Sequence, residues 1–361
     1  MRRAIAWVGA MAVLVGCGVV PQPRRNVEME QAIDKSDVAE ILDHYRDVRN
    51  TAIGLLDAKP LSIVEGGPML AVDSGSFEVS QRLSRTESED ERELQVTTIE
   101  APSFSKYPLW FMVTAFDPAA RVDVVQIFER RTPVDPWLLV AAPQTVPSTR
   151  VPSVRHDGDG NAIRVSPTNG KGMEMSPQRA ADAYSRTLGS MSDTTAGVER
   201  DDFIRKMRSA FVQANSLEGV SVTQTWAAEK VDHALRTKDG GALVWVTLLR
   251  LDKYTVQPGI KVSWPWGSAQ QAFLADGISN TGKLRYYHQV LLYLPGGKEK
   301  PRALGQYGGV ISADAQAALS PNTPGGDPFD FPTVGSTPGA TSVPTPKPSS
   351  TPSNPFQYLE P

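Results

Sequence analysis

Cysteine is almost absent from this chain of 361 residues, in which Cys17 is the only one. A lone cysteine forms no intramolecular disulfide, and beyond position 17 the chain has no thiolate nucleophile and no cysteine ligand for a metal. The folded part must therefore be stabilised by noncovalent packing.

Histidine is also scarce, and the four histidines do not show the His-Glu-x-x-His spacing of zinc proteases; they are His44, His156, His233 and His288. The sequence also lacks a Gly-x-Ser-x-Gly nucleophile elbow, a Walker phosphate loop and a dinucleotide-binding fingerprint. We expect no metal and no cofactor, and we expect no nucleic-acid partner.

One acidic segment, Asp157-x-Asp159-x-Asn161, has the beginning of a calcium loop. An EF-hand loop requires glycine at its sixth position and a bidentate acid at its twelfth. Those positions hold Ala162 and Thr168 here, so the sequence favours a turn over a calcium site.

Long apolar runs are absent as well, and the apolar segment at 4–15 has only twelve residues. A helix needs roughly 20 apolar residues to cross a hydrocarbon core of about 30 Å, so this segment is too short to span a membrane. Met1-Arg2-Arg3 gives it a positive start, which is typical of a secretory signal. We therefore expect residues 1–16 to be a signal peptide.

Leu14-Val15-Gly16-Cys17 closes that segment and resembles the bacterial lipobox, in which a leucine stands three residues before the lipidated cysteine. The resemblance implies that the Cys17 thiol carries a diacylglyceryl group and that the signal is removed before it. Two acyl chains anchor a protein stably, so it would sit on the outer face of the cytoplasmic membrane. The alternative is an ordinary secretory signal with a chance cysteine.

Charge is unevenly distributed behind the net value of −3. Residues 26–142 carry 21 acidic and 11 basic side chains, whereas residues 177–316 carry 13 acidic and 17 basic ones. Opposite signs favour docking between the two halves or an anionic partner for the second half. Two separately solvated surfaces would give the same count.

The first half begins with apolar residues that recur at steps of three and four over 38–56, which predicts an amphipathic helix. Gly66-Gly67-Pro68 is interpreted as a break, with a short helix expected around 77–83. Segments rich in branched and aromatic residues then predict an antiparallel meander, at 94–100, 109–116, 122–130 and 137–142. A helix packed on this sheet makes an α+β unit.

The second half follows a proline-containing connector at 143–176. Ser176 and Pro177 mark the start of a helix, and another helix is expected over 199–214. Further strands are expected at 220–226, 233–237, 242–254, 284–294 and 302–311. The second half therefore repeats the order of the first, with helices before an antiparallel sheet.

The sequence thus predicts an α+β fold of two tandem domains, interpreted as a degenerate repeat. The expected boundaries are a signal peptide at 1–16, a tether at 17–25, a first domain at 26–142, a linker at 143–176, a second domain at 177–316 and a disordered Pro/Ser/Thr-rich tail at 317–361. The element order resembles NTF2-like or cystatin-like folds, and the whole chain resembles uncharacterised lipoproteins of actinobacteria.

Two tryptophans on a Pro-Gly loop, Trp264-Pro265-Trp266-Gly267, form the most unusual local feature. Exposed indoles would provide a stacking or anchoring surface for a sugar or a partner protein. The alternative is that both cover the core of the second half. Trp264 and Trp266 are therefore the candidate ligand-binding residues, and no catalytic residue is assigned.

The sequence supports a membrane-anchored envelope lipoprotein whose folded part is a non-catalytic binding or scaffolding module. Its expected partners are the membrane, through Cys17, and an envelope protein or anionic polymer. The alternative is a hydrolase or other enzyme that acts on an envelope polymer through a pocket in one of the sheets.

Overall fold

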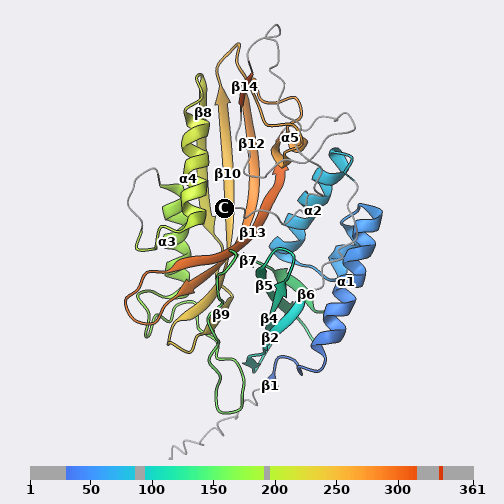
Figure 1. The fold of residues 1–361 in the computed structure, drawn as a ribbon, viewed down its shortest axis with the longest axis vertical. Helices are drawn as coiled ribbons and strands as arrows, with labels where there is room; N and C mark the ends of the chain where they lie inside the picture. The colour runs from blue at the N-terminus through green and yellow to red at the C-terminus, as the bar shows by residue number, and fades with distance from the viewer. Residues whose placement is uncertain (1–29, 86–93, 191–195, 315–332, 336–361) are drawn as a thin grey trace, which may run out of the picture.

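The computed structural model describes residues 30–85, 94–190, 196–314 and 333–335. The predicted signal peptide, Cys17 and the predicted tether lie outside these residues, as does the predicted tail apart from 333–335. The described chain has an α+β fold, which confirms the expected class, and it is elongated, with a large antiparallel sheet and helices on its flanks (Figure 1). None of the described helices is long and apolar enough to cross a membrane.

The first half opens with helix α1 (Val38–Leu55), which confirms the predicted amphipathic helix, and continues through the 3-10 helix η1 (Lys59–Ile63). Helix α2 (Gly67–Arg82) is far longer than the short helix expected at 77–83. The expected break coincides with the boundary between η1 and α2, where Gly66 is the extended N-cap residue. The helix nevertheless begins at once, because Pro68 lies in the first turn of α2, where the backbone N–H that proline lacks would have no partner within the helix.

The predicted meander of the first half is confirmed. Its strands are β2 (Gln95–Glu100), β4 (Leu109–Asp117), β5 (Val122–Arg130) and β6 (Leu138–Ala141). Antiparallel pairing joins β2 to β4, β4 to β5 and β5 to β6. A separate pair joins β1 (Glu30–Gln31) to β3 (Ser103–Phe104).

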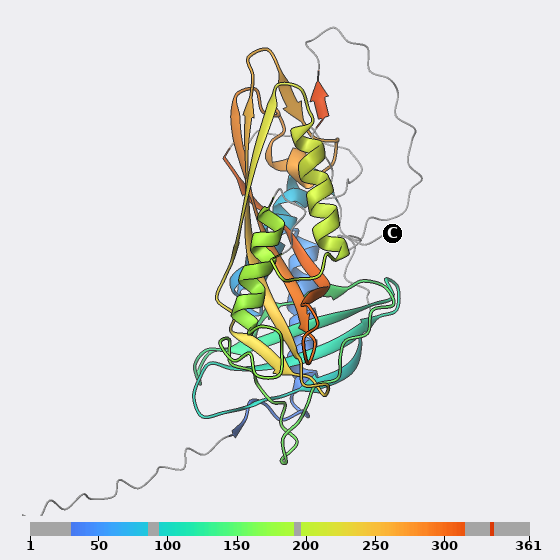
Figure 2. The ribbon, with the colours of Figure 1, turned by 90° about the vertical axis from the view of Figure 1, so that its left-hand side faces the viewer.

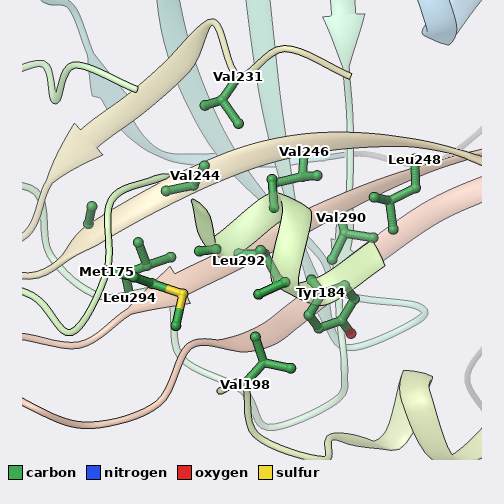
Figure 3. Packing of buried hydrophobic residues seen from close by; sticks show 14 of the residues in the cluster. Met175, Tyr184, Val198, Val231, Val244, Val246, Leu248, Val290, Leu292 and Leu294 are labelled. Carbon is green, nitrogen blue, oxygen red and sulfur yellow. The ribbon is translucent and has the colours of Figure 1, made fainter. Parts of the chain in front are cut away.

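The second half has two helices, α3 (Pro177–Gly189) and α4 (Asp202–Asn215), on one face of its strands (Figure 2). Those strands are β8 (Val220–Ala228), β9 (His233–Arg236), β10 (Ala242–Val256), β12 (Thr281–Leu294) and β13 (Arg302–Ala313). Buried residues of α3 and of β10 and β12 interlock beneath the helices, with Tyr184 fully buried among them (Figure 3). These elements confirm the predicted helices and strands.

Three short elements complete the second half. Helix α5 (Ala269–Phe273) follows strand β11 (Lys261–Ser263), which pairs with β14 (Thr333–Gly335). The tail expected to be disordered therefore contributes one ordered strand, because extended backbone at 333–335 satisfies hydrogen-bonding groups of β11.

Strands of both halves belong to one ten-stranded sheet. Eight of them follow the order β2-β4-β5-β7-β13-β12-β10-β8, and the other two lie off this path, with β6 paired to β5 and β9 paired to β10. The joint is β7 (Gln144–Thr145), which lies in the predicted linker and pairs with β5 and β13. Gln289 of β12 adds side-chain bonds across the joint, donating to the carbonyl of Val140 at 2.8 Å and accepting from the Ala142 amide at 3.0 Å. The division into two domains stays a prediction.

Glycines permit two close approaches that hold this arrangement. A Cβ at Gly305 of β13 would lie 2.2 Å from the carbonyl oxygen of Gln144, at the joint itself. A Cβ at Gly75 of α2 would lie 2.2 Å from the carbonyl oxygen of Val310, where α2 packs on β13. The helix of the first half thus contacts the backbone of the second half without an intervening side chain.

Replacing Gly75 with alanine should destabilise the protein by roughly 1–3 kcal/mol, because the added methyl overpacks the α2–β13 contact. Gly54→Ala is the matched control, since a Cβ at this glycine of α1 meets nothing within 4 Å. The control should stabilise by up to about 1 kcal/mol through helix propensity. Urea unfolding measures the free energy of unfolding of both variants. If Gly75→Ala stabilised the protein as much as Gly54→Ala does, the close approach of α2 to β13 would be contradicted.

Candidate functional site

A cavity of about 560 Å³ opens between the first turns of α1, the segment after β1 and the end of β5. Its inner wall is apolar and aromatic, with buried Ile33, Val64 and Phe128 and half-buried Tyr45 and Trp137. Ionisable side chains also line it, namely Asp34, Asp37, Glu40, His44 and Arg130. A few polar groups around an apolar wall are typical of sites for small ligands.

The acids of this cavity come from the start of α1 and from the segment just before it. Asp37 occupies the N-cap position, but its side chain makes no capping bond to the helix and accepts instead from the Ser36 hydroxyl at 3.3 Å. Asp34 accepts from the Ser36 amide at 3.4 Å. These carboxylates thus keep most of their hydrogen-bonding capacity for solvent or a ligand.

Arg130 is the basic side chain on the opposite wall. Its guanidinium donates to the backbone carbonyls of Asp135 at 2.9 Å and Pro133 at 2.6 Å, and it lies 5.9 Å from the ring centre of Trp137. These contacts orient it toward the loop after β5 rather than toward the acids of α1.

A buried charge cluster lies directly behind the cavity wall. The Tyr45 hydroxyl donates to Glu65 Oε1 at 2.9 Å, and Arg49 lies 3.4 Å from the same oxygen. Arg49 also forms a short ion pair with Asp73 of α2, which accepts from the Tyr307 hydroxyl of β13. Arg49 is 7% exposed, and Glu65 and Asp73 are each 1% exposed.

The cluster contains two carboxylates but a single guanidinium, so it carries a net negative charge when both acids are ionised. Burial raises the pKa of Glu65 well above its ordinary value, and nearby Asp73 raises it further. Within the described residues Glu65 Oε2 has no hydrogen-bond partner. A protonated Glu65 makes the cluster neutral.

This raised pKa makes stability depend on pH. The folded state holds the Glu65 proton more tightly than the unfolded chain does, so this stabilisation is lost as pH rises from the ordinary value of about 4.3 toward the raised one. Glu65→Gln should remove this dependence of the free energy of unfolding on pH. The stability of the variant relative to the parent protein should therefore increase with pH. Urea unfolding at several pH values tests this, with Glu78→Gln as the control. If the free energy of unfolding of Glu65→Gln changed with pH just as that of the parent protein does, a raised pKa of Glu65 would be contradicted.

A second cavity of about 220 Å³ lies where the two halves meet. His233 Nε2 lies 3.0 Å from Glu129 Oε2, and Arg131 donates to Glu129 Oε1 at 3.3 Å. Burial raises the pKa of Glu129, but the hydrogen bonds from His233 and Arg131 outweigh it, and the pKa is lowered. Both carboxylate oxygens are therefore engaged.

The histidines are not brought together. His44 lines the larger cavity, His233 the smaller one, and His156 bonds Glu100 at 2.5 Å. His288 is buried in the second half, where desolvation lowers its pKa well below the ordinary value. The described residues contain no group of three His, Cys, Asp or Glu side chains that could hold a metal ion.

Asp157 forms the turn that the sequence favoured. Its Oδ1 accepts from the amides of Asp159 at 3.0 Å and Asn161 at 2.9 Å. The carboxylate closes its own loop, which explains the Asp-x-Asp-x-Asn spacing without a cation.

The two tryptophans of the Pro-Gly loop lie in different environments. Trp264 is 5% exposed and packs edge-to-face on Tyr254 at 5.2 Å, whereas Trp266 is 49% exposed. Neither lines the two cavities described above. Trp266 is thus the indole that a partner could reach.

Comparison with known proteins places the chain in a family. Residues 29–315 match the family described as "Domain of unknown function (DUF8094)". The chain belongs to this family. An uncharacterised lipoprotein of Streptomyces avermitilis is 25% identical over 270 residues, which cover 73% of this chain and 79% of the relative. An uncharacterised lipoprotein of Streptomyces coelicolor is 25% identical over 282 residues, covering 73% and 83%.

The expected resemblance to uncharacterised lipoproteins is confirmed by these relatives. No solved structure gives a significant match to this DUF8094 chain. Cys17 precedes both the family region and the described residues, so its lipidation stays a prediction.

Sequence reasoning missed the cavity and its buried cluster. A signal was present for one member, because Arg49 stands four residues after Tyr45 and therefore on the inward face of α1. A charged residue on such a face indicates a buried ion pair. No comparable signal marks Tyr307, which lies 234 residues from its partner Asp73.

Proposed function

We propose that this protein is an envelope lipoprotein, anchored through acyl chains on Cys17 to the outer face of the cytoplasmic membrane, and that its folded part is a non-catalytic binding module. The lipobox pattern supports the anchor, and the names of the Streptomyces relatives agree with it.

The cavity beside α1 is the observation that supports the proposed binding role most directly. Its volume of about 560 Å³ lies within the range of roughly 300–1,000 Å³ found for ligand pockets. Gln31, at the end of β1, lines it, so the cavity lies close to the point where the described chain begins. The twelve residues between Cys17 and Glu30 allow a separation of at most about 45 Å, which keeps the cavity near the bilayer.

Of the two expected partner classes, an envelope protein suits this cavity better than an anionic polymer, because three acids line it. Exposed Trp266 would supply a further contact on the second half. An anionic polymer would instead meet the basic second half.

The repeated order of helices and strands supports a finer proposal about origin. Helices α1 and α2 precede the meander of the first half, β2, β4, β5 and β6, and α3 and α4 precede the strands of the second half. We therefore retain the tandem NTF2-like or cystatin-like repeat as a proposal.

An enzyme acting on an envelope polymer is the second candidate, favoured by the His233–Glu129 pair in the smaller cavity. An imidazole beside a carboxylate is the pairing that general-base catalysis uses. We place it second because Arg131 and His233 already occupy both oxygens of Glu129.

Cys17→Ala should release the protein from membranes or leave an unprocessed precursor, because the acyl chains are the proposed anchor. Membrane fractionation with immunoblotting measures the distribution. Gly16→Ala is the matched control, since it keeps a small residue before the cysteine and should leave the protein membrane-bound. A membrane-bound Cys17→Ala protein of mature size would contradict the proposal.

A further inference from the structure

We propose that the cavity beside α1 binds an alkyl cation, an ammonium or guanidinium head on an aliphatic stem, such as a lysine or arginine side chain of a partner polypeptide. This inference rests on the proposed binding function and names the chemistry that the same cavity would select.

The acids of the cavity wall provide the charge. Asp34, Asp37 and Glu40 all line the cavity, and no ion pair within the described residues involves any of them. By contrast, Asp43 on the same helix is paired with Arg46. A cation entering the cavity would therefore meet carboxylates that form no competing ion pair.

Arg130, the base on the opposite wall, forms no ion pair with these acids. The Arg130 guanidinium is held by the carbonyls of Asp135 and Pro133, on the far side of the cavity. Three acids line the cavity against one arginine and one histidine, so the lining carries a net negative charge when the acids are ionised. An anionic ligand would be repelled.

The aromatic wall provides a surface for the head and the stem. Tyr45 packs edge-to-face on Phe128 with ring centres 6.2 Å apart, and Phe111 fixes Trp137 in the same way at 4.9 Å. Aromatic faces attract ammonium and guanidinium groups, and Arg130 already lies over Trp137. Ile33 and Val64 complete the apolar wall, where an aliphatic stem would be buried.

The hydroxyl of Tyr45 is already engaged inside the protein, because it donates to Glu65 at 2.9 Å and accepts from Arg49 at 3.4 Å. Recognition then depends on the carboxylates at the rim and the rings at the wall. Removal of the rim charges should weaken binding without disturbing the buried cluster.

The direct test is titration of the soluble protein, residues 18–361, with n-butylammonium and N-propylguanidinium, and with an acetylated six-residue peptide that contains one lysine. Tryptophan fluorescence and calorimetry give the affinities. n-Pentanol and butyrate serve as neutral and anionic probes. We expect the cations to bind at least tenfold more tightly than either of these, and binding should weaken with salt, since charges are screened within about 8 Å at physiological ionic strength.

The variant for the test combines Asp34→Asn, Asp37→Asn and Glu40→Gln. The matched control combines Asp43→Asn with Asp47→Asn, which removes exposed acids from the same helix outside the cavity. We expect at least tenfold weaker cation binding for the first variant and less than twofold change for the control, with thermal unfolding confirming that both are folded.

The outcomes separate the two proposals. Tighter binding of the peptide than of free cations supports a polypeptide partner, and equal binding supports a free organic cation; both support the cation chemistry. Binding of pentanol or butyrate as tight as that of the cations, if Trp137→Leu abolishes it, would overturn the cation class and leave the binding function standing. No binding of any probe would overturn the cavity as a ligand site and, with it, the structural basis of the proposed function.

Discussion

A guanidinium buried between two helices is the interaction on which the arrangement of this protein depends. Arg49 of α1 pairs with Asp73 of α2 and lies 3.4 Å from Glu65, and Asp73 accepts from Tyr307 of β13. Removing one partner from a buried ion pair is typically destabilising by about 3–5 kcal/mol, because the other charge is left in an apolar interior. The cluster therefore specifies how α1, α2 and β13 lie together.

The position of α2 follows from that constraint. It lies against β13 with Gly75 over the backbone of Val310, while β7 pairs with the other end of the same strand. The two halves consequently share one sheet and one apolar cluster, in which Trp110 and Ile127 of the first half meet Leu243 and Leu291 of the second. The cavity beside α1 is formed on the outer side of this assembly, with Tyr45 belonging to both the wall and the cluster.

Much of the secondary structure was predictable from the sequence, because local periodicity determines it. Helix α1 and strand β5 were placed within a residue of their ends, since their apolar residues follow one clear period. Helix α2 was not, because its inner face holds Asp73 and Gly75 in place of an unbroken apolar stripe. The pairing of β7 with β13 involves only two residues of β7, and their partners lie about 160 positions away in the sequence. No local sequence pattern therefore predicts it.

The most direct test of the coupling between the halves is a double-mutant cycle on the bond between Asp73 and Tyr307. The free energies of unfolding of Asp73→Asn, Tyr307→Phe and the double variant are measured with urea. If the cluster couples the halves, the double variant should lose less stability than the sum of the single losses, by roughly 0.5–3 kcal/mol, as contacting residues do. Additivity within about 0.5 kcal/mol would show that the two residues act independently and would contradict the account.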